Sequence, residues 1–176
     1  IITDGDGVSA INHFRDQNDF GFFDWMTSAI GYHMVSQPET CVIGAGGGGD
    51  VAQALVLGAS RVFAVEMNQQ VIDLMGNKLS DFSGGLYNRS DVEVISAEGR
   101  NFLQTTKKKF DVINISLLDS FSASAAGLYA LNESHLYTIE AIEQAIERLG
   151  PNGLLSITRM LKTPPRDSLK ILATVA

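Results

Sequence analysis

A dense glycine cluster follows the short apolar run Cys41-Val42-Ile43. In the segment Gly44-Ala45-Gly46-Gly47-Gly48-Gly49, every residue except Ala45 is glycine. Glycine permits positive φ and lets the backbone approach a ligand closely, and a helix that follows such a loop presents free backbone N–H groups. Because parallel α/β sheets bind ligands at the carboxyl ends of their strands, the cluster is a candidate binding loop. The alternative interpretation is a tight strand-to-helix turn that holds no ligand.

The glycine pattern narrows the ligand class. The string fits G-x-G-x-x-G, a pattern of low specificity that makes a dinucleotide one candidate. A P-loop is excluded because Asp50 follows Gly49 where a lysine is required. Asp50 also places a negative charge in the first turn of the expected helix, where a pyrophosphate would have to lie. Because like charges repel and the loop contains no Lys or Arg, a ligand with a cationic centre would fit better.

Two acids stand at the ends of the next two expected strands. Glu66 closes the second strand, where its carboxylate can accept the hydrogens of both ribose hydroxyls of NAD or of an adenosyl ligand. Glu98, followed by Gly99, closes the third strand, where an acidic residue can meet an adenine amino group. For both acids the alternative is a solvated side chain that touches no ligand.

Segments typical of strands and of helices alternate from about residue 40 onward. Strand patterns occupy residues 41–43, 61–66, 92–96, 110–116 and 154–159, and helical patterns occupy residues 50–57, 68–79, 99–105, 136–149 and a last segment from 167. Because each helix must return the chain to the same end of the sheet, the alternation predicts a doubly wound, mostly parallel α/β sheet of five core strands. Residues 1–36 are expected to form an N-terminal arm with a helix near Asp19–Tyr32, and residues 37–176 the nucleoside-binding α/β domain.

Composition excludes several classes of protein. The 176 residues are 45% hydrophobic, enough for one core, and their net charge of −7 has the wrong sign for binding nucleic acid or an acidic membrane surface. One cysteine, Cys41, and three scattered histidines predict neither an internal disulfide nor a metal site. No membrane-spanning stretch or secretory signal is visible, which favours a cytoplasmic location. Both ends look cut, so we expect further C-terminal strands and membrane segments outside this piece.

Four motifs in order suggest a family. CVIGAGGGGD, RVFAVEMN, VEVISAEGRNFL and FDVINISLLDS resemble the successive motifs of spermidine synthases and, more broadly, of class I S-adenosylmethionine-dependent methyltransferases. The resemblance covers roughly residues 40–160 and implies a Rossmann-like fold. It also implies a nucleoside ligand that carries a sulfonium, either S-adenosylmethionine or its decarboxylated form.

The resemblance assigns expected roles to the donor side of the site. Glu66 would hold the ribose hydroxyls, Met67 would flank the adenine, and Glu98 with Gly99 would contact the adenine edge. The amino-acid or aminopropyl part of the ligand would lie against the loop residues Gly44, Ala45, Gly46 and Gly48.

The acceptor side departs from the synthase pattern. Where the synthases place the Asp that accepts the amine's proton, this sequence has Ser116, and only the second acid, Asp119, remains. Ser116 and Asp119 are therefore the candidate catalytic residues, although Asp119 is equally interpreted as a turn or helix cap. A lone serine is a poor proton acceptor without an activating partner. Gly47 replaces an acid of the synthase loop, so putrescine is not expected as the acceptor.

Three functions follow from these observations. The first is a transferase that moves a methyl or aminopropyl group from the sulfonium nucleoside to an unidentified small-molecule acceptor. The second is a non-catalytic nucleoside-binding domain of a larger protein, and the third is an NAD-binding oxidoreductase domain. A homodimer and a fusion to membrane segments outside this chain are the expected assemblies, and no nucleic-acid partner is expected.

Overall fold

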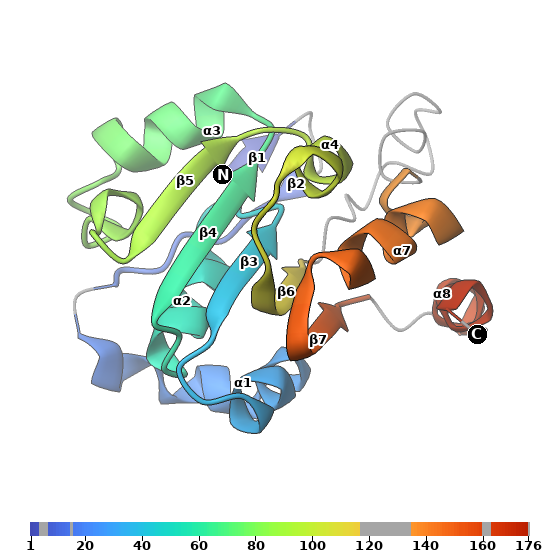
Figure 1. Ribbon diagram of the computed structural model, residues 1–176. Helices are drawn as coiled ribbons and strands as arrows, with labels where there is room; N and C mark the ends of the chain where they lie inside the picture. The colour runs from blue at the N-terminus through green and yellow to red at the C-terminus, as the bar shows by residue number, and fades with distance from the viewer. Residues whose placement is uncertain (4–6, 15, 117–134, 160–162, 176) are drawn as a thin grey trace.

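A five-stranded parallel sheet forms the centre of the molecule (Figure 1). The computed structural model describes residues 1–3, 7–14, 16–116, 135–159 and 163–175. The strands lie in the order β5-β4-β3-β6-β7, and each neighbouring pair is parallel. Their bounds are β3 Glu39–Ile43, β4 Arg61–Glu66, β5 Val92–Ser96, β6 Phe110–Ile115 and β7 Leu149–Ile157. The predicted doubly wound α/β sheet of five core strands is confirmed.

Helices cover both faces of this sheet. Alternate residues of one strand point to opposite faces, so Val42 joins one apolar cluster while its neighbours Cys41 and Ile43 join the other. The helices on the Val42 face are α1 Ile30–Met34, α2 Gly49–Val56 and α3 Gln69–Asp73, and those on the opposite face are α4 Gly99–Thr105 and α7 Ile139–Glu147. The last helix, α8 Arg166–Val175, lies beside α7.

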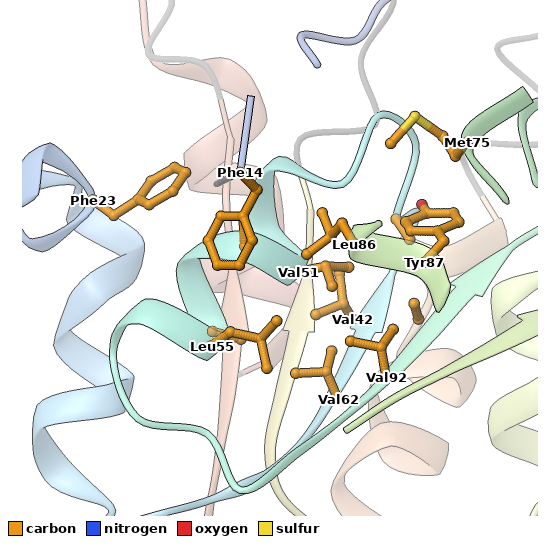
Figure 2. Close-up of a cluster of buried hydrophobic side chains, with 14 of the residues drawn as sticks. Phe14, Phe23, Val42, Val51, Leu55, Val62, Met75, Leu86, Tyr87 and Val92 are labelled. Atoms are coloured by element: carbon orange, nitrogen blue, oxygen red, sulfur yellow. The ribbon is translucent and has the colours of Figure 1, made fainter. Parts of the chain in front are cut away.

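Figure 2 shows the cluster on the Val42 face. Val51 and Leu55 of α2 lie above the strand residues Val42 and Val62, and Tyr87 comes from the 3-10 turn η4 Leu86–Asn88. Aromatic side chains of the N-terminal segment complete the cluster. Because branched and aromatic residues fill both faces, the strands are held firmly and their carboxyl ends can position a site.

The N-terminal segment differs from the expectation of one helix near Asp19–Tyr32. It contains a short hairpin, β1 Ile2–Thr3 with β2 Gly7–Val8, then the 3-10 segments η1 Gln17–Trp25 and η2 Thr27–Ala29, and finally α1. The helical path breaks at Phe20 (φ −107°, ψ 22°) and at Met26, which is extended. Phe20 packs against Phe14 and Phe23, with ring centroids 5.2 and 5.4 Å apart, and this buried aromatic packing outweighs a continuous helix.

Two further elements differ from the sequence expectation in detail. The helix expected over residues 68–79 begins as α3 but continues as the π-helical turn η3 Leu74–Lys78. The strand expected over residues 154–159 is part of β7, which already begins at Leu149 and bulges at residues 150–153, where the pairing moves from Phe110–Leu149 to Val112–Leu154. Asn152 takes a positive φ of 63° at this bulge.

Within the described ranges, no helix has the length and apolar character needed to cross a membrane.

Candidate functional site

The glycine loop connects the end of β3 to the start of α2. Gly44, Gly46 and Gly48 have φ values of 82°, 51° and 84°, which other residues rarely adopt. The backbone N–H groups of Gly44 and Ala45 donate to the carbonyl of Val65 at 2.9 and 3.0 Å. The loop is thus tied to the neighbouring strand β4 at the carboxyl edge of the sheet.

Glu66, the last residue of β4, lies along this loop and is only 8% exposed. One carboxylate oxygen accepts the N–H of Gly46 at 2.9 Å, and the other accepts the N–H of Asn68 at 2.8 Å. Each oxygen of a carboxylate can accept a further hydrogen bond. The side chain is therefore a buried acid at the loop with capacity left for two hydroxyl hydrogens.

The N–H groups of the central glycines already have acceptors within the protein. Gly46 donates to Glu66, Gly47 donates to the hydroxyl of Ser9 at 2.6 Å, and Gly48 donates to the carbonyl of Ala45 at 2.8 Å. A pyrophosphate needs such donors to be free. The loop therefore offers an anion little, which argues against the dinucleotide interpretation.

The N-terminal arm lies directly on the glycine loop, and sequence reasoning missed this contact. A Cβ atom added at Gly47 would overlap the carbonyl oxygen of Ala10, and one added at Gly46 would lie 2.7 Å from the hydroxyl oxygen of Ser9. In Figure 1 the β1–β2 hairpin that precedes these residues stands at the arrowhead of β4. Gly47, which stands where the resembling synthase loop has an acid, is thus packed against the arm, and a larger residue there would clash with Ala10.

Tyr87 supports the loop from the opposite side and was also missed. Its hydroxyl donates to the carbonyl of Gly46 at 2.7 Å, and burial, with a smaller contribution from the charge of Glu66, raises its pKa. Leu86 packs against the loop so closely that a Cβ atom at Gly48 would lie 2.5 Å from it. No local motif marks these residues, because η4 reaches the loop only through the tertiary fold.

Glu98 caps the helix that follows β5. Its carboxylate accepts the N–H groups of Arg100 and Asn101 at 2.9 and 2.8 Å, which is the usual arrangement of a helix N-cap. Ala97 donates to the carbonyl of Glu66 at 3.1 Å, so the two acids follow strand ends that are hydrogen-bonded to each other. Glu98 serves the helix in this structure, and its remaining lone pairs are what a ligand could use.

Gly99 and Met67, the other two residues of the expected adenine contact, lie in different surroundings. Gly99 is buried, and a Cβ atom there would overlap Ile43 and lie 3.3 Å from Leu136. Met67 is 61% exposed at the end of β4. An apolar side chain that is open to solvent beside Glu66 suits the flanking of a flat ring.

Ser116 is brought to the loop by the sheet. Its N–H donates to the carbonyl of Ile43 at 3.1 Å, and Ile43 is the residue just before Gly44. The side chain of Ser116 is buried, with 3% of the residue exposed. Asp50, partly buried in the first turn of α2, has its pKa raised by burial, while the hydroxyl of Ser116 acts to lower it. Asp119, the other candidate catalytic residue, lies outside the described residues.

The structure therefore brings the loop glycines, Glu66, Asp50 and Ser116 together at one edge of the sheet, with Glu98 and Gly99 at the neighbouring strand. The sequence analysis considered Asp50 only for its negative charge, and it did not predict that Asp50 lies near Ser116. Nowhere in the described part of the chain do three His, Cys, Asp or Glu side chains gather closely enough to hold a metal ion.

Comparisons with known proteins find similarity in sequence to one family and to several named relatives. Residues 26–162 match the family model of the spermine/spermidine synthase domain. The polyamine aminopropyltransferase of Thermoplasma acidophilum is 26% identical over 117 residues, which are 65% of this chain and 42% of that protein. The chain thus spans less than half the length of this relative.

Solved structures show the same fold. The spermidine synthase of Thermotoga maritima superposes with a TM-score of 0.60 at 21% identity, covering 89% of this chain and 49% of that one. The ribosomal protein L11 methylase of Lactobacillus delbrueckii superposes with a TM-score of 0.51 at 18% identity, covering 84% and 65%. The resemblance to the class I methyltransferase fold, stated from the motifs, is confirmed.

Proposed function

Because the chain belongs to the spermine/spermidine synthase family, we propose that it binds decarboxylated S-adenosylmethionine at the glycine loop and transfers the aminopropyl group to a small-molecule amine. The observation that carries this proposal is the arrangement of the loop. Its glycine N–H groups are used internally, and the buried carboxylate of Glu66 lies along it. Such a site favours a ligand with hydroxyl donors and a positive charge over a phosphate.

The residues of the loop edge fit an adenosyl group. Glu66 would accept the ribose hydroxyl hydrogens through its second lone pairs, and Met67 would lie against the adenine. Glu98 would receive a hydrogen from the adenine amino group while it continues to cap α4. When bound, the donor supplies an electrophilic carbon next to a positively charged sulfur, and the chain's part is to position the acceptor in line with it and take its proton.

The electrostatics of the chain support a cationic donor and acceptor. Asp50 and Glu66 flank the glycine loop, which contains no Lys or Arg, and the chain as a whole carries a net charge of −7. A focused negative potential raises the local concentration of cations. S-Adenosylmethionine carries a carboxylate that its decarboxylated form lacks, so the same field favours the decarboxylated nucleoside.

Titration calorimetry with the purified chain tests the donor. Decarboxylated S-adenosylmethionine and its product methylthioadenosine should bind, S-adenosylmethionine should bind more weakly, and NADH should not bind. Equal or tighter binding of NADH would overturn the assignment. Mass spectrometry of reactions with a panel of primary amines then detects an aminopropyl adduct.

A second function is favoured by one observation. Ser116 stands where the synthase motif has its proton-accepting Asp, so the domain could bind the nucleoside without transferring it. Binding of methylthioadenosine with no adduct on any amine of the panel would support this non-catalytic interpretation, and any adduct would exclude it.

A further inference from the structure

A row of buried polar side chains lies on the α2 face of strand β6. Val112, Asn114 and Ser116 alternate with residues that face the other way, and Val112 packs in the cluster that contains α2. Asn114 is 1% exposed and Ser116 is 3% exposed. Among the described residues, neither the amide of Asn114 nor the hydroxyl of Ser116 has a hydrogen-bond partner of good geometry.

Unpartnered buried polar groups are uncommon, because each loses its bonds to water without replacement. Tyr32 of α1 adds a third such group on the same face, since its buried hydroxyl also has no partner in the described chain. α1 lies over β6, as the 4.0 Å approach of a Cβ built at Gly31 to Val112 shows. The face therefore holds several donors and acceptors that the described residues do not satisfy.

Asp50 faces these groups from α2. The hydroxyl of Ser116 is close enough to lower the pKa of Asp50. The pKa of Tyr32 is raised mainly by burial and further by the charge of Asp50. The pKa of the Asp50 carboxyl is affected by burial and by the neutral hydroxyl of Ser116, and by no positive charge of the described residues. The carboxylate therefore stands beside the glycine loop with no cationic partner identified in the described chain.

We propose that Asp50, with Ser116 beside it, is the carboxylate that binds the acceptor amine and takes its proton. Asp50 thereby supplies from helix α2 the acid that the end of β6 lacks. The inference rests on the proposed function, because it assigns the acceptor side of the same site. Asp50 follows the glycine loop that would hold the donor. Ser116 is hydrogen-bonded through its N–H to Ile43, the last residue before that loop. Asp50 is thus placed beside both the glycine loop and Ser116, the last residue of the buried polar row.

Asp50 receives the proton that the amine nitrogen loses as its lone pair forms the new carbon–nitrogen bond. The carbon–sulfur bond of the donor breaks in the same displacement, and its electron pair stays on the sulfur, which becomes a neutral thioether. A carboxylate whose protonated form is favoured by burial is a stronger base than an exposed one. Ser116 lies close to the carboxylate but does not take the proton itself, because a serine hydroxyl alone does not take a proton near neutral pH.

The test compares the 176-residue chain with Asp50→Asn, Ser116→Ala and the control Asp81→Asn, which makes the same change at an exposed acid. Each protein is titrated with methylthioadenosine, and the saturated complex is then titrated with two primary amines, propylamine and butylamine. Asp50→Asn should bind methylthioadenosine within about twofold of wild type. Its affinity for both amines should fall about tenfold or more, since a charge-assisted hydrogen bond is lost.

Each outcome decides the proposal. Undiminished amine binding by Asp50→Asn, or no amine binding by the wild-type complex, overturns the role of Asp50 and leaves the donor site standing. Failure of wild type to bind methylthioadenosine overturns the proposed function, and the role of Asp50 falls with it. A loss for Asp50→Asn that Asp81→Asn does not share, with a smaller loss for Ser116→Ala, supports the proposal. Thermal unfolding of each variant confirms that it is folded.

Discussion

The carboxylate of Glu66 accepts the backbone N–H of Gly46 at 2.9 Å, joining the end of β4 to the middle of the glycine loop. The same hydrogen bond fixes the loop and removes a donor that an anion would need. The second oxygen of Glu66 holds Asn68, which begins α3. One buried acid thus joins the end of β4 to the glycine loop and to the start of α3, and it keeps lone pairs for a ligand.

Replacing Glu66 by Ala is expected to weaken methylthioadenosine binding by about 1–3 kcal/mol, because charge-assisted hydrogen bonds to the ribose are lost. Glu66→Gln keeps the size of the side chain and should produce a smaller loss. Calorimetric titration measures both. Unchanged affinity in Glu66→Ala would show that the ribose lies elsewhere.

Tyr87→Phe separates support of the loop from contact with the ligand. The substitution removes the 2.7 Å hydrogen bond to the carbonyl of Gly46 and leaves the ring in place. Losing one buried hydrogen bond should lower the free energy of unfolding by about 1 kcal/mol. Urea unfolding measures the loss, and no change would mean that water replaces the hydroxyl.

The loop glycines can be tested with a matched pair. Gly48 has a φ of 84°, and a Cβ atom there would lie 2.5 Å from Leu86, whereas a Cβ atom at Gly49 meets nothing within 4 Å. Gly48→Ala should therefore lower the free energy of unfolding by about 1–2 kcal/mol, because alanine is strained in the left-handed conformation. Displacement of Leu86 by the new Cβ atom would add to this loss. Gly49→Ala, at the start of α2, should be neutral or slightly stabilising.

Thermal unfolding compares the two variants. Equal melting temperatures for Gly48→Ala and Gly49→Ala would contradict the left-handed conformation of Gly48. A loss in both variants would instead indicate that the end of the loop, Gly48-Gly49, tolerates no side chain.

The sheet was predictable because its signals are local. The strand pattern of residues 92–96 and the helical pattern of residues 99–105 coincide with β5 and α4, since apolar residues alternate in one and glutamate caps the other. The N-terminal segment was not predictable in the same way. There the packing of Phe20 between Phe14 and Phe23 decides the backbone, and no periodicity records which distant residues an aromatic will meet.

Part of the candidate site was likewise predictable from local sequence, and part was not. The glycine loop and Glu66 are found from sequence because a strand-end acid and a glycine run are visible within their own segments. Ser9 and Tyr87 contact the loop from residues far away in the chain, so only the folded structure reveals them. The closeness of Asp50 to Ser116 likewise depends on the register that places the end of β6 beside the end of β3.

Asp50→Asn should stabilise the chain at neutral pH even though it removes amine binding. Burial raises the pKa of Asp50 above its ordinary value of 3.8, so the folded state holds the proton more tightly than the unfolded state does. The stability from this group is present below that ordinary value and is lost as the pH rises through the raised pKa. Asparagine carries no charge and does not incur that loss.

Melting temperatures measured from pH 4 to pH 8 check this dependence. The advantage of Asp50→Asn over wild type should grow as the pH rises, by about 2–4 °C for each kcal/mol in a chain of this size. Asp91, whose pKa is lowered by its hydrogen bond to Arg89, loses its contribution as the pH falls, but it does so equally in both proteins. The difference between the two curves therefore isolates Asp50, and a constant difference would mean that its carboxyl titrates as it does in the unfolded chain. A residue that weakens the fold in its charged form and binds the amine in that form would be kept for its chemistry.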